Sequence, residues 1–538
     1  MNGPRNLVLA LMFVILAVSF STASDIYIAQ NAAGGNTGAD CADAHSLSFF
    51  NTYGNWGSGK PIAPGTTVHL CGTFNAPAGS SEYLVFQGSG ASGSVITLLF
   101  ESGAVLTAPY WSGGVIDVAG NSYVVVDGGA NGTIQATANG TNQANHQDGG
   151  ECVISHEPGI ATDVTVENLT CANLYIDASL ADNGGEDTYG IDLSNANNLV
   201  EQNNTLHDMK WAIRVSYQVG SNFSNLTIAG NNIYNMDHGV FTGASDSSGT
   251  ASLSGATISG NKFGSMTAWD NTANNNHHDW MHISSNDASM SYTDVYIENN
   301  YASGDVGYNA NAGIYLAEQN GSLTGAAVNN VFVNTATNHC WANGFLLEND
   351  NAGAFLLANN TFVSQVAHDA CTNNGGTYPG DNGIVEDSSS NLTIENNILV
   401  SMKNDNFYSE GGSSLAGMDY NDEYNGGAWS WNGSGGMTLF TLWQSDCHCD
   451  AHSILTNPGL NSGSAPPYQL AGSSSLAYRT GTNLTAAYCG RIPALCTGAE
   501  GNPRPTSGAW DIGAYQYSGS GSTPTPPTPP TGLTATVQ

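Results

Sequence analysis

A strand-like segment that ends in asparagine recurs through the middle of this 538-residue chain. Clear copies are residues 226–232, 256–261, 295–300 and 392–397, where alternating β-branched residues lead into the asparagine. The aligned positions are Asn203, Asn231, Asn261, Asn300, Asn330, Asn360 and Asn397, spaced by 28, 30, 39, 30, 30 and 37 residues. A short unit interrupted by insertions of varying length is typical of proteins built from stacked coils.

A second pattern, a small residue followed by apolar–X–apolar, alternates with the first. Its copies are residues 190–193, 212–215, 239–242, 280–283, 313–316, 344–347 and 383–386. Period-2 alternation places the apolar residues inside and X outside, and equivalent residues of successive coils stack about 4.8 Å apart. We therefore expect an all-β chain, a single right-handed parallel β-helix with long loops. Its turn asparagines are expected to adopt left-handed backbone angles and to bond to the backbone or to one another.

Segments near both ends extend the pattern. Residues 64–70 read Pro-Gly-Thr-Thr-Val-His-Leu, and residues 501–505 and 510–517 form a terminal segment rich in proline and aromatic residues. With the repeats, the start resembles the pectate-lyase-like superfamily of parallel β-helix proteins. The end is similar to that of secreted bacterial β-helix proteins with a C-terminal anchor or sorting tail. The resemblance spans roughly residues 25–480 and implies the fold.

The resemblance supplies no catalytic residue. The chain lacks the Asn-Thr-Asp, Asp-Asp and Gly-His-Gly set of polygalacturonases. It also lacks an Arg-X-Pro-X-X-Arg signature of the pectate-lyase kind within the coils. Candidate site residues therefore come from the stacking pattern alone.

The N-terminus and the cysteines indicate a secreted protein. A weakly basic start, an apolar run over residues 7–18 and Ser21-Thr22-Ala23 predict a signal peptide over residues 1–23. The predicted β-helix with its caps spans residues 24–517, and residues 518–538 form a Ser/Thr/Pro-rich tail expected to be disordered. Ten cysteines fit an oxidising compartment.

Nearby cysteines are expected to pair. The predicted disulfides are Cys41–Cys71, Cys152–Cys171, Cys340–Cys371 and Cys489–Cys496. Cys447-His448-Cys449 is compatible with a metal site, but a structural zinc site normally shows two ligand pairs at fixed spacing. A disulfide or loop packing is the favoured interpretation there.

The charge balance excludes some partners. The chain has 9 Lys and Arg against 44 Asp and Glu, a formal net charge of −35. Nucleic acid needs clustered cations, and anionic membrane surfaces attract basic segments, so neither partner is expected. No segment after residue 23 is long and apolar enough for membrane insertion.

The X residues should form one outward column. In order they are Asp192, Arg214, Phe241, His282, Tyr315, Leu346 and Val385, of which the first five are polar or aromatic. Neighbouring positions add Lys210, Trp211, Asp237, His238, His277, His278 and Asp279. In a chain so poor in bases, two cations in one patch form a candidate site. The alternative is that Arg214 simply pairs with Asp192 and that the histidines are turn residues.

Such a patch suits a sugar polymer, because rings stack on pyranose faces and hydroxyls need directed hydrogen bonds. The predicted catalytic residues are Asp237, Asp279, His278 and His282. The predicted substrate-binding residues are Asp192, Lys210, Trp211, Arg214, His238, Phe241 and Tyr315. Hydrolysis would use the carboxylate pair Asp237 and Asp279, whereas β-elimination needs a base and a cation beside a uronate carboxylate.

Metal use stays open at this point. The many acids make Ca²⁺ a candidate. For residues 277–282 (His-His-Asp-Trp-Met-His), acid–base or sugar-binding roles are favoured over a transition metal. The sequence thus predicts a secreted protein that binds and cleaves a polysaccharide, as a lyase or a glycoside hydrolase. The alternative is a non-catalytic surface protein, an adhesin or a filament-forming solenoid, attached to cells or self-associating.

Overall fold

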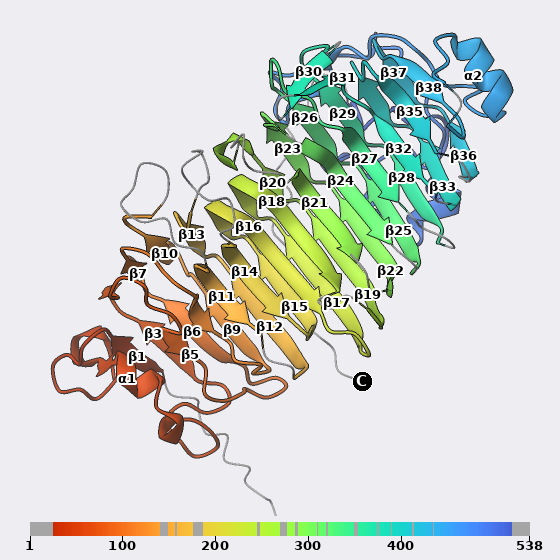
Figure 1. Cartoon of the computed structure of the whole chain (residues 1–538). Coiled ribbons are helices and arrows are strands. Elements are labelled where there is room, and N and C mark those ends of the chain that lie inside the picture. The colour runs from red at the N-terminus through yellow and green to blue at the C-terminus, as the bar shows by residue number, and fades with distance from the viewer. Residues whose placement is uncertain are drawn as a thin grey trace, which may run out of the picture.

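The computed structural model describes residues 25–518 except 140–148, 157–158, 176–186, 245–247, 270–276, 286–288, 309, 319–320, 349–352, 369, 374–375, 389, 411–413 and 434. The predicted signal peptide and all but the first residue of the predicted tail lie outside these residues. The chain is an all-β, right-handed parallel β-helix. Figure 1 shows its strands stacked in chain order along one axis.

Each coil contributes strands to three faces, which we call A, B and C. Face A consists of β2(His45–Ser46), β1(Ile26–Ala29), β3(Thr67–Leu70), β6(Ile96–Phe100), β9(Val124–Asp127), β12(Ala161–Glu167), β15(Ala196–Gln202), β17(Asn222–Ala229), β19(Thr250–Ser259), β22(Ser289–Glu298), β25(Leu323–Val328), β28(Phe355–Ala358), β33(Ser390–Glu395) and β36(Ser414–Asp419). All of its pairings are parallel.

Faces B and C are joined because two long strands run through both. Face B consists of β4(Thr73–Asn75), β7(Val105–Ala108), β10(Thr133–Ala136), β13(Thr170–Ala172), the first parts of β16(Thr205–Tyr217) and β18(Asn232–Ala244), β20(Lys262–Phe263), β23(Tyr301–Gly304), β26(Val331–Asn334), β29(Thr361–Ser364), β34(Ile398–Val400) and β37(Asp422–Tyr424). Face C consists of β5(Leu84–Val85), β8(Gly114–Asp117), β11(Glu151–Ser155), β14(Tyr189–Ser194), the second parts of β16 and β18, β21(His278–Ser285), β24(Ala310–Glu318), β27(Asn343–Glu348), β32(Ile384–Asp387), β35(Asp405–Ser409) and β38(Ala428–Ser430).

Short elements complete the structure. They are the α-helices α1(Leu47–Phe50) and α2(Phe440–Cys447), two antiparallel pairs, β30(Ala370–Asn373) with β31(Gly376–Pro379) and β39(Leu460–Asn461) with β40(Gln469–Leu470), and single helical turns at Cys41–Asp43, Tyr53–Asn55, Thr267–Trp269, Thr485–Cys489 and Pro493–Cys496. Within the described part of the chain, no helix is long and apolar enough to cross a membrane.

The core is filled by columns of stacked apolar side chains. One column on face C lies in register across eight strands: Ile191, Ile213, Val240, Met281, Ile314, Phe345, Ile384 and Phe407, all fully buried. All of them except Phe407, which lies one coil beyond the last copy, are residues that the small–apolar–X–apolar pattern directs inward. Parallel register and period-2 alternation therefore fix which residues of face C point outward.

Buried asparagines form a continuous ladder at the turn between faces A and B. Its members are Asn204, Asn231, Asn261, Asn300, Asn330, Asn360, Asn397 and Asn421. The alignment on Asn203 was wrong by one residue, because the left-handed conformation and the ladder bond belong to two successive residues. Asn203 has a φ of 57°, and Asn204 donates its backbone N–H to Asn231 Oδ1 at 2.9 Å.

Replacing Asn300 by alanine should lower the free energy of unfolding by about 3–5 kcal/mol, because buried partners lose their hydrogen bonds. Its side chain is 1% exposed and bonds to Asn261, Asn330 and the carbonyl of Ile258 at 2.8–3.0 Å. Urea unfolding of the variant measures the effect. The matched control is Asn222→Ala, an exposed asparagine in β17, for which a change below about 1 kcal/mol is expected. Equal effects would contradict a special role for the ladder.

All four predicted disulfides are present, and the fifth joins Cys447 to Cys449. The Cys447–Cys449 bond removes both thiols from the alternative metal site there. Nearby, α2 packs on the last coil, where Trp443 is fully buried 5.4 Å from the ring of Phe407.

The chain after the last coil returns along the outside of the helix. Tyr468, Ala514 and Tyr515 cover the outer side of β26 and β29, and Trp510 packs with residues of β25 and β28. Arg504 is 3% exposed and donates to Asn329 Oδ1 at 2.9 Å. The terminal segment therefore covers the sides of faces A and B.

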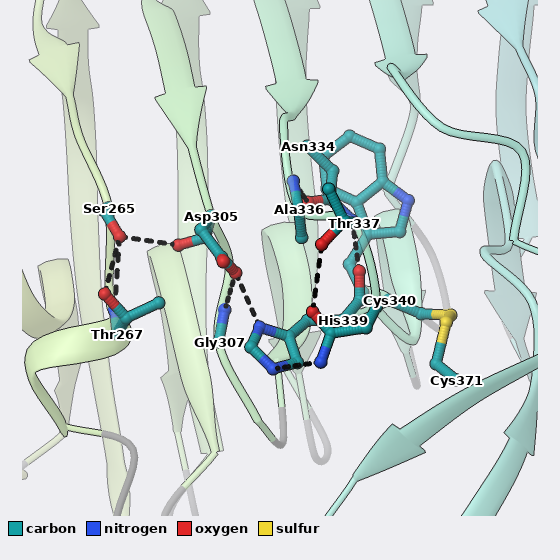
Figure 2. A network of polar contacts seen from close by, with 12 residues as sticks. Ser265, Thr267, Asp305, Gly307, Asn334, Ala336, Thr337, His339, Cys340 and Cys371 are labelled. Atoms are coloured by element: carbon teal, nitrogen blue, oxygen red, sulfur yellow. Dashed lines mark hydrogen bonds and ion pairs between the residues drawn. A yellow bond between two sulfur atoms is a disulfide. The ribbon is translucent and has the colours of Figure 1, made fainter.

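Polar networks also fill the bends between faces B and C. Figure 2 shows one, in which His339 Nδ1 lies 2.7 Å from Asp305 Oδ1 and Ser265 Oγ donates to the Asp305 carbonyl. The adjacent Cys340 is bonded to Cys371. These groups connect three coils, as expected of histidines with a structural role.

Candidate catalytic groove

The predicted outward column exists in the expected register. Asp192, Arg214, Phe241, His282, Tyr315, Leu346 and Val385 are consecutive partners on β14 to β32. A second column runs beside it through Tyr189, Trp211, His238, Asp279, Ala312 and Asn343. Face C thus brings most of the predicted residues onto one surface.

A groove of about 540 Å³ lies over the first part of these columns. It is lined by His156, Asp187, Tyr189, Ser194, Trp211, Arg214, Ser216, His238, Phe241, Ala244, His277 and His282. Trp211 stacks on His238 with ring centroids 4.0 Å apart and meets Phe241 edge-on at 5.0 Å. The lining combines aromatic faces, imidazoles and a guanidinium, a composition that can hold a sugar polymer.

One end of the groove is built around Asp279, whose side chain is fully buried. Its Oδ2 lies 2.9 Å from His282 Nδ1, 3.2 Å from His277 Nε2 and 3.5 Å from His238 Nε2. Its Oδ1 accepts the backbone N–H of Ala312 at 2.8 Å. Burial opposes ionisation, but hydrogen bonds from His277 and His282 outweigh it and hold the pKa of Asp279 below its usual value.

Asp237 orients one histidine of this cluster through a hydrogen bond. It is fully buried, and its two oxygens bond Nδ1 of His238, at 3.0 Å, and Nδ1 of His278. The two histidines hold the pKa of Asp237 below its usual value in spite of burial. Because the ring of His238 bonds Asp237 through Nδ1, its Nε2 is turned toward Asp279.

The other end of the groove carries the cation. Arg214 Nη2 lies 2.6 Å from Asp192 Oδ2, and Nη1 donates to the Tyr189 hydroxyl at 2.6 Å. His156 Nε2 also reaches Asp192, at 2.9 Å, and lies 3.6 Å from Glu151 Oε2. Hydrogen bonding to Asp192 raises the pKa of His156, while burial and the charge of Asp192 raise that of Glu151 to about 7.

The structure divides the predicted residues into two groups. Trp211, Arg214, His238, Phe241 and His282 line the groove, whereas Asp192, Asp237, Asp279 and His278 are buried behind its wall. The alternative in which Arg214 pairs with Asp192 describes a contact that is present. Lys210 is outside the lining and pairs with Asp187 at 2.7 Å. Tyr315 lies beside His282, with ring centroids 4.5 Å apart, and donates to Glu348 at 2.5 Å.

The sequence analysis placed His277 in the patch without a catalytic or binding role, and it did not select His156 or Glu151. His277, with its side chain 47% exposed, takes the place at the groove surface that was assigned to His278. A partial signal for Glu151 exists: residues 152–154 (Cys-Val-Ile) continue the pattern for one more coil, although Ser155 stands where the pattern has an apolar residue. Extending the repeat by one coil would have found Glu151 and His156.

Three groups of side chains have the composition of metal sites among the described residues. Cys340, His368 and Cys371 are not a candidate, because the two thiols form a disulfide. Glu151, His156 and Asp192 supply two carboxylates, but Arg214 already occupies Asp192. His238, His277, Asp279 and His282 place one ligand atom each within 4.8 Å of one another. Three of these donors are nitrogen, which does not suit Ca²⁺, whose protein ligands are oxygens.

Comparisons with known proteins give a limited result. No protein-family model matches the chain, and no curated protein matches it. Among solved structures, pectate lyase Pel9A aligns over 93% of this chain and 97% of its own length, at 15% identity and a TM-score of 0.37. The A-module of Azotobacter vinelandii mannuronan C-5 epimerase AlgE6 aligns over 73% of this chain and 91% of its own, at 14% identity and a TM-score of 0.29. Likeness at this level does not extend to substrate or activity.

Proposed function

We propose that the protein is a secreted polysaccharide lyase that binds a uronate-containing chain in the face C groove and cleaves it by β-elimination. The observation that carries the proposal is the division of charge at the groove. Three nitrogen-bearing side chains, Arg214, His156 and His277, reach the groove surface. The carboxylates that bond them, Asp192 and Asp279, are buried behind it. Five disulfides fit an extracellular location.

Hydrolysis by the predicted pair Asp237 and Asp279 is disfavoured by the same arrangement. A glycoside hydrolase needs one protonated carboxyl group against the glycosidic oxygen. Both side chains are 0% exposed, and their histidine neighbours keep them ionised by lowering their pKa. Asp187, an exposed carboxylate of the lining, is paired with Lys210.

The cationic end would hold uronate carboxylates. Arg214 is 28% exposed and keeps a guanidinium edge at the groove, and His156 is 41% exposed. With a net charge of −35, the molecule repels anionic polymers elsewhere on its surface. Two coils along the helix, about 10 Å away, lies the histidine cluster. A polymer along the axis would therefore meet both ends.

His277 is assigned the proton transfer. Burial opposes its protonation, but the hydrogen bond and charge of Asp279 raise its pKa above the ordinary value, which helps the imidazole to take up a proton. The imidazole takes the proton at C5 of the uronate, the C4=C5 double bond forms, and the C4–O bond breaks. The imidazolium then returns the proton to the leaving oxygen, which regenerates the neutral imidazole.

The test uses the mature chain and a panel of uronate and neutral polysaccharides. We expect reducing ends together with the ultraviolet absorbance of unsaturated uronates, and a loss of about 10²–10⁴-fold in kcat for His277→Gln. The control is His452→Gln, an exposed histidine outside the groove, for which activity should stay unchanged. Reducing ends without unsaturation would replace the lyase by a hydrolase, and binding without products would favour a non-catalytic surface protein.

A further inference from the structure

The geometry points to a site for one divalent transition-metal ion, with Zn²⁺ as the best match, formed by His238, His277, Asp279 and His282. This inference goes beyond the proposed function, because an ion would be held whether or not a polysaccharide is cleaved. Both ends of the site are fixed by the fold: His238 lies in β18, Asp279 and His282 lie in the next coil in β21, and His277 directly precedes β21.

Four of the six distances among the ligand atoms fit the edges of a tetrahedron, and all four atoms lie within 4.8 Å of one another. Bonds of about 2.0–2.1 Å to a tetrahedral Zn²⁺ place its ligands roughly 3.4 Å from one another. Asp279 Oδ2 lies 2.9, 3.2 and 3.5 Å from nitrogens of His282, His277 and His238. His277 Nε2 and His282 Nδ1 are 3.4 Å apart. At these four edges, shifts of up to about 0.5 Å would reach tetrahedral geometry.

Without a bound ion, one ring nitrogen of this histidine cluster has no hydrogen-bond partner among the described residues. His238 is 3% exposed, and its Nε2 makes no hydrogen bond to any described residue although it is aimed at Asp279. His339 at the network of Figure 2 differs, because a single carboxylate faces its ring. Three imidazoles converging on one carboxylate oxygen therefore form a ligand set rather than an ordinary ion pair.

Outer groups orient three of the four ligands, as is usual in metal sites. Asp237 Oδ2 lies 3.0 Å from Nδ1 of His238 and fixes Nε2 as the free nitrogen. Ser284 Oγ lies 2.8 Å from Nε2 of His282 and can accept a hydrogen bond from the Nε2–H when Nδ1 binds the ion. The Ala312 N–H holds the second oxygen of Asp279. His277, half-exposed at the groove, offers the entry path.

The test is titration of the chelator-treated mature chain with Co²⁺, a coloured probe of tetrahedral sites, followed by competition with Zn²⁺. We expect one ion per chain, intense visible bands typical of four-coordinate Co²⁺ and their loss on adding Zn²⁺. His277→Asn, which removes an exposed ligand, should weaken binding at least about 100-fold. Ser284→Ala keeps every ligand and should weaken binding about 10-fold. The matched control His452→Asn should bind as the parent does.

Weak, colourless Co²⁺ binding, or equal affinity in the His277→Asn and His452→Asn variants, would overturn the inference. Circular dichroism of each variant separates loss of a ligand from loss of the fold. The titration needs no polysaccharide. If no ion binds, the lyase proposal still stands. If an ion binds, that result does not depend on the lyase proposal. One consequence does rest on the proposed function: an ion on His277 Nε2 would block proton transfer, so Zn²⁺ should inhibit cleavage.

Discussion

Arg214→Gln should weaken binding of a uronate polysaccharide about 30- to 100-fold, because hydrogen bonds from a charged donor contribute roughly 1.5–3 kcal/mol. Arg214 is the arginine of the groove lining, and its guanidinium already bonds Asp192 and Tyr189. Removing it also leaves buried Asp192 with His156 as its cationic partner. Binding is measured by calorimetry with an oligouronate, at two salt concentrations, since the cation should account for much of the salt dependence.

The matched control is Lys210→Gln. Lys210 lies in the same strand, β16, but pairs with Asp187 and does not line the groove. We expect a change below about 5-fold, corresponding to a partly exposed ion pair worth at most about 1 kcal/mol. If both variants lose affinity equally, the effect is one of net charge and the carboxylate subsite at Arg214 is wrong. If Arg214→Gln and the parent bind a neutral oligosaccharide equally well, the loss of affinity for the oligouronate is specific to the carboxylate.

The columns of face C could be predicted because two periodicities agree there. Alternation within a strand decides inside from outside, and the parallel register carries that choice from coil to coil. Asp192, Arg214 and Phe241 therefore stand where the pattern puts them. The order of stacking needs no knowledge of loops, since insertions between coils leave the register unchanged.

Local irregularities limited the prediction elsewhere. A register shift between His278 and Asp279 turns His278 inward to Asp237 and leaves His277 at the groove. Such shifts re-aim side chains and have no signature in alternation. The Asn-Asn turns were ambiguous for another reason, because either residue can adopt positive φ. Gly230-Asn231 resolves the choice: glycine takes the left-handed position, so the second residue is the ladder member.

The charge interactions among the buried residues beneath the groove surface could not be predicted from one sequence. The histidine cluster joins residues 41 positions apart through Asp237 and His278. Which carboxylates are buried depends on side-chain directions that the repeat leaves open. As a result, Asp237 and Asp279, which were predicted to be catalytic, instead bond and orient histidines.

The protein should be more stable near pH 5 than near pH 8, with a difference in unfolding free energy of at least about 3 kcal/mol. Burial raises the pKa of Asp422 to about 8, and that of Glu151 and Glu500 to about 7. The folded state thus binds these protons more tightly than the unfolded chain does. Their stabilisation is complete below the unfolded pKa near 4 and is lost as the pH rises through 7–8, at up to about 1.4 kcal/mol per pH unit and group.

Histidines act in the same direction over this range. Asp279 raises the pKa of His277 against the effect of burial, and a hydrogen bond to Asp381 raises that of His368, so their stabilisation is lost above about pH 6.5. Asp237 and Asp279, whose pKa values are lowered, destabilise the fold only when the pH falls below about 4. The stability maximum should therefore lie at mildly acidic pH.

Asp422→Asn isolates the largest of these three pKa shifts. Asp422 is fully buried in β37, and one of its oxygens makes no hydrogen bond to a described residue. An amide of the same shape carries no charge at any pH, so urea unfolding with the disulfides intact should show a shallower decline between pH 5 and pH 8. Exposed Asp446→Asn should leave that slope unchanged. Parallel pH profiles for the parent and Asp422→Asn would mean that the carboxyl group is ionised in the folded protein.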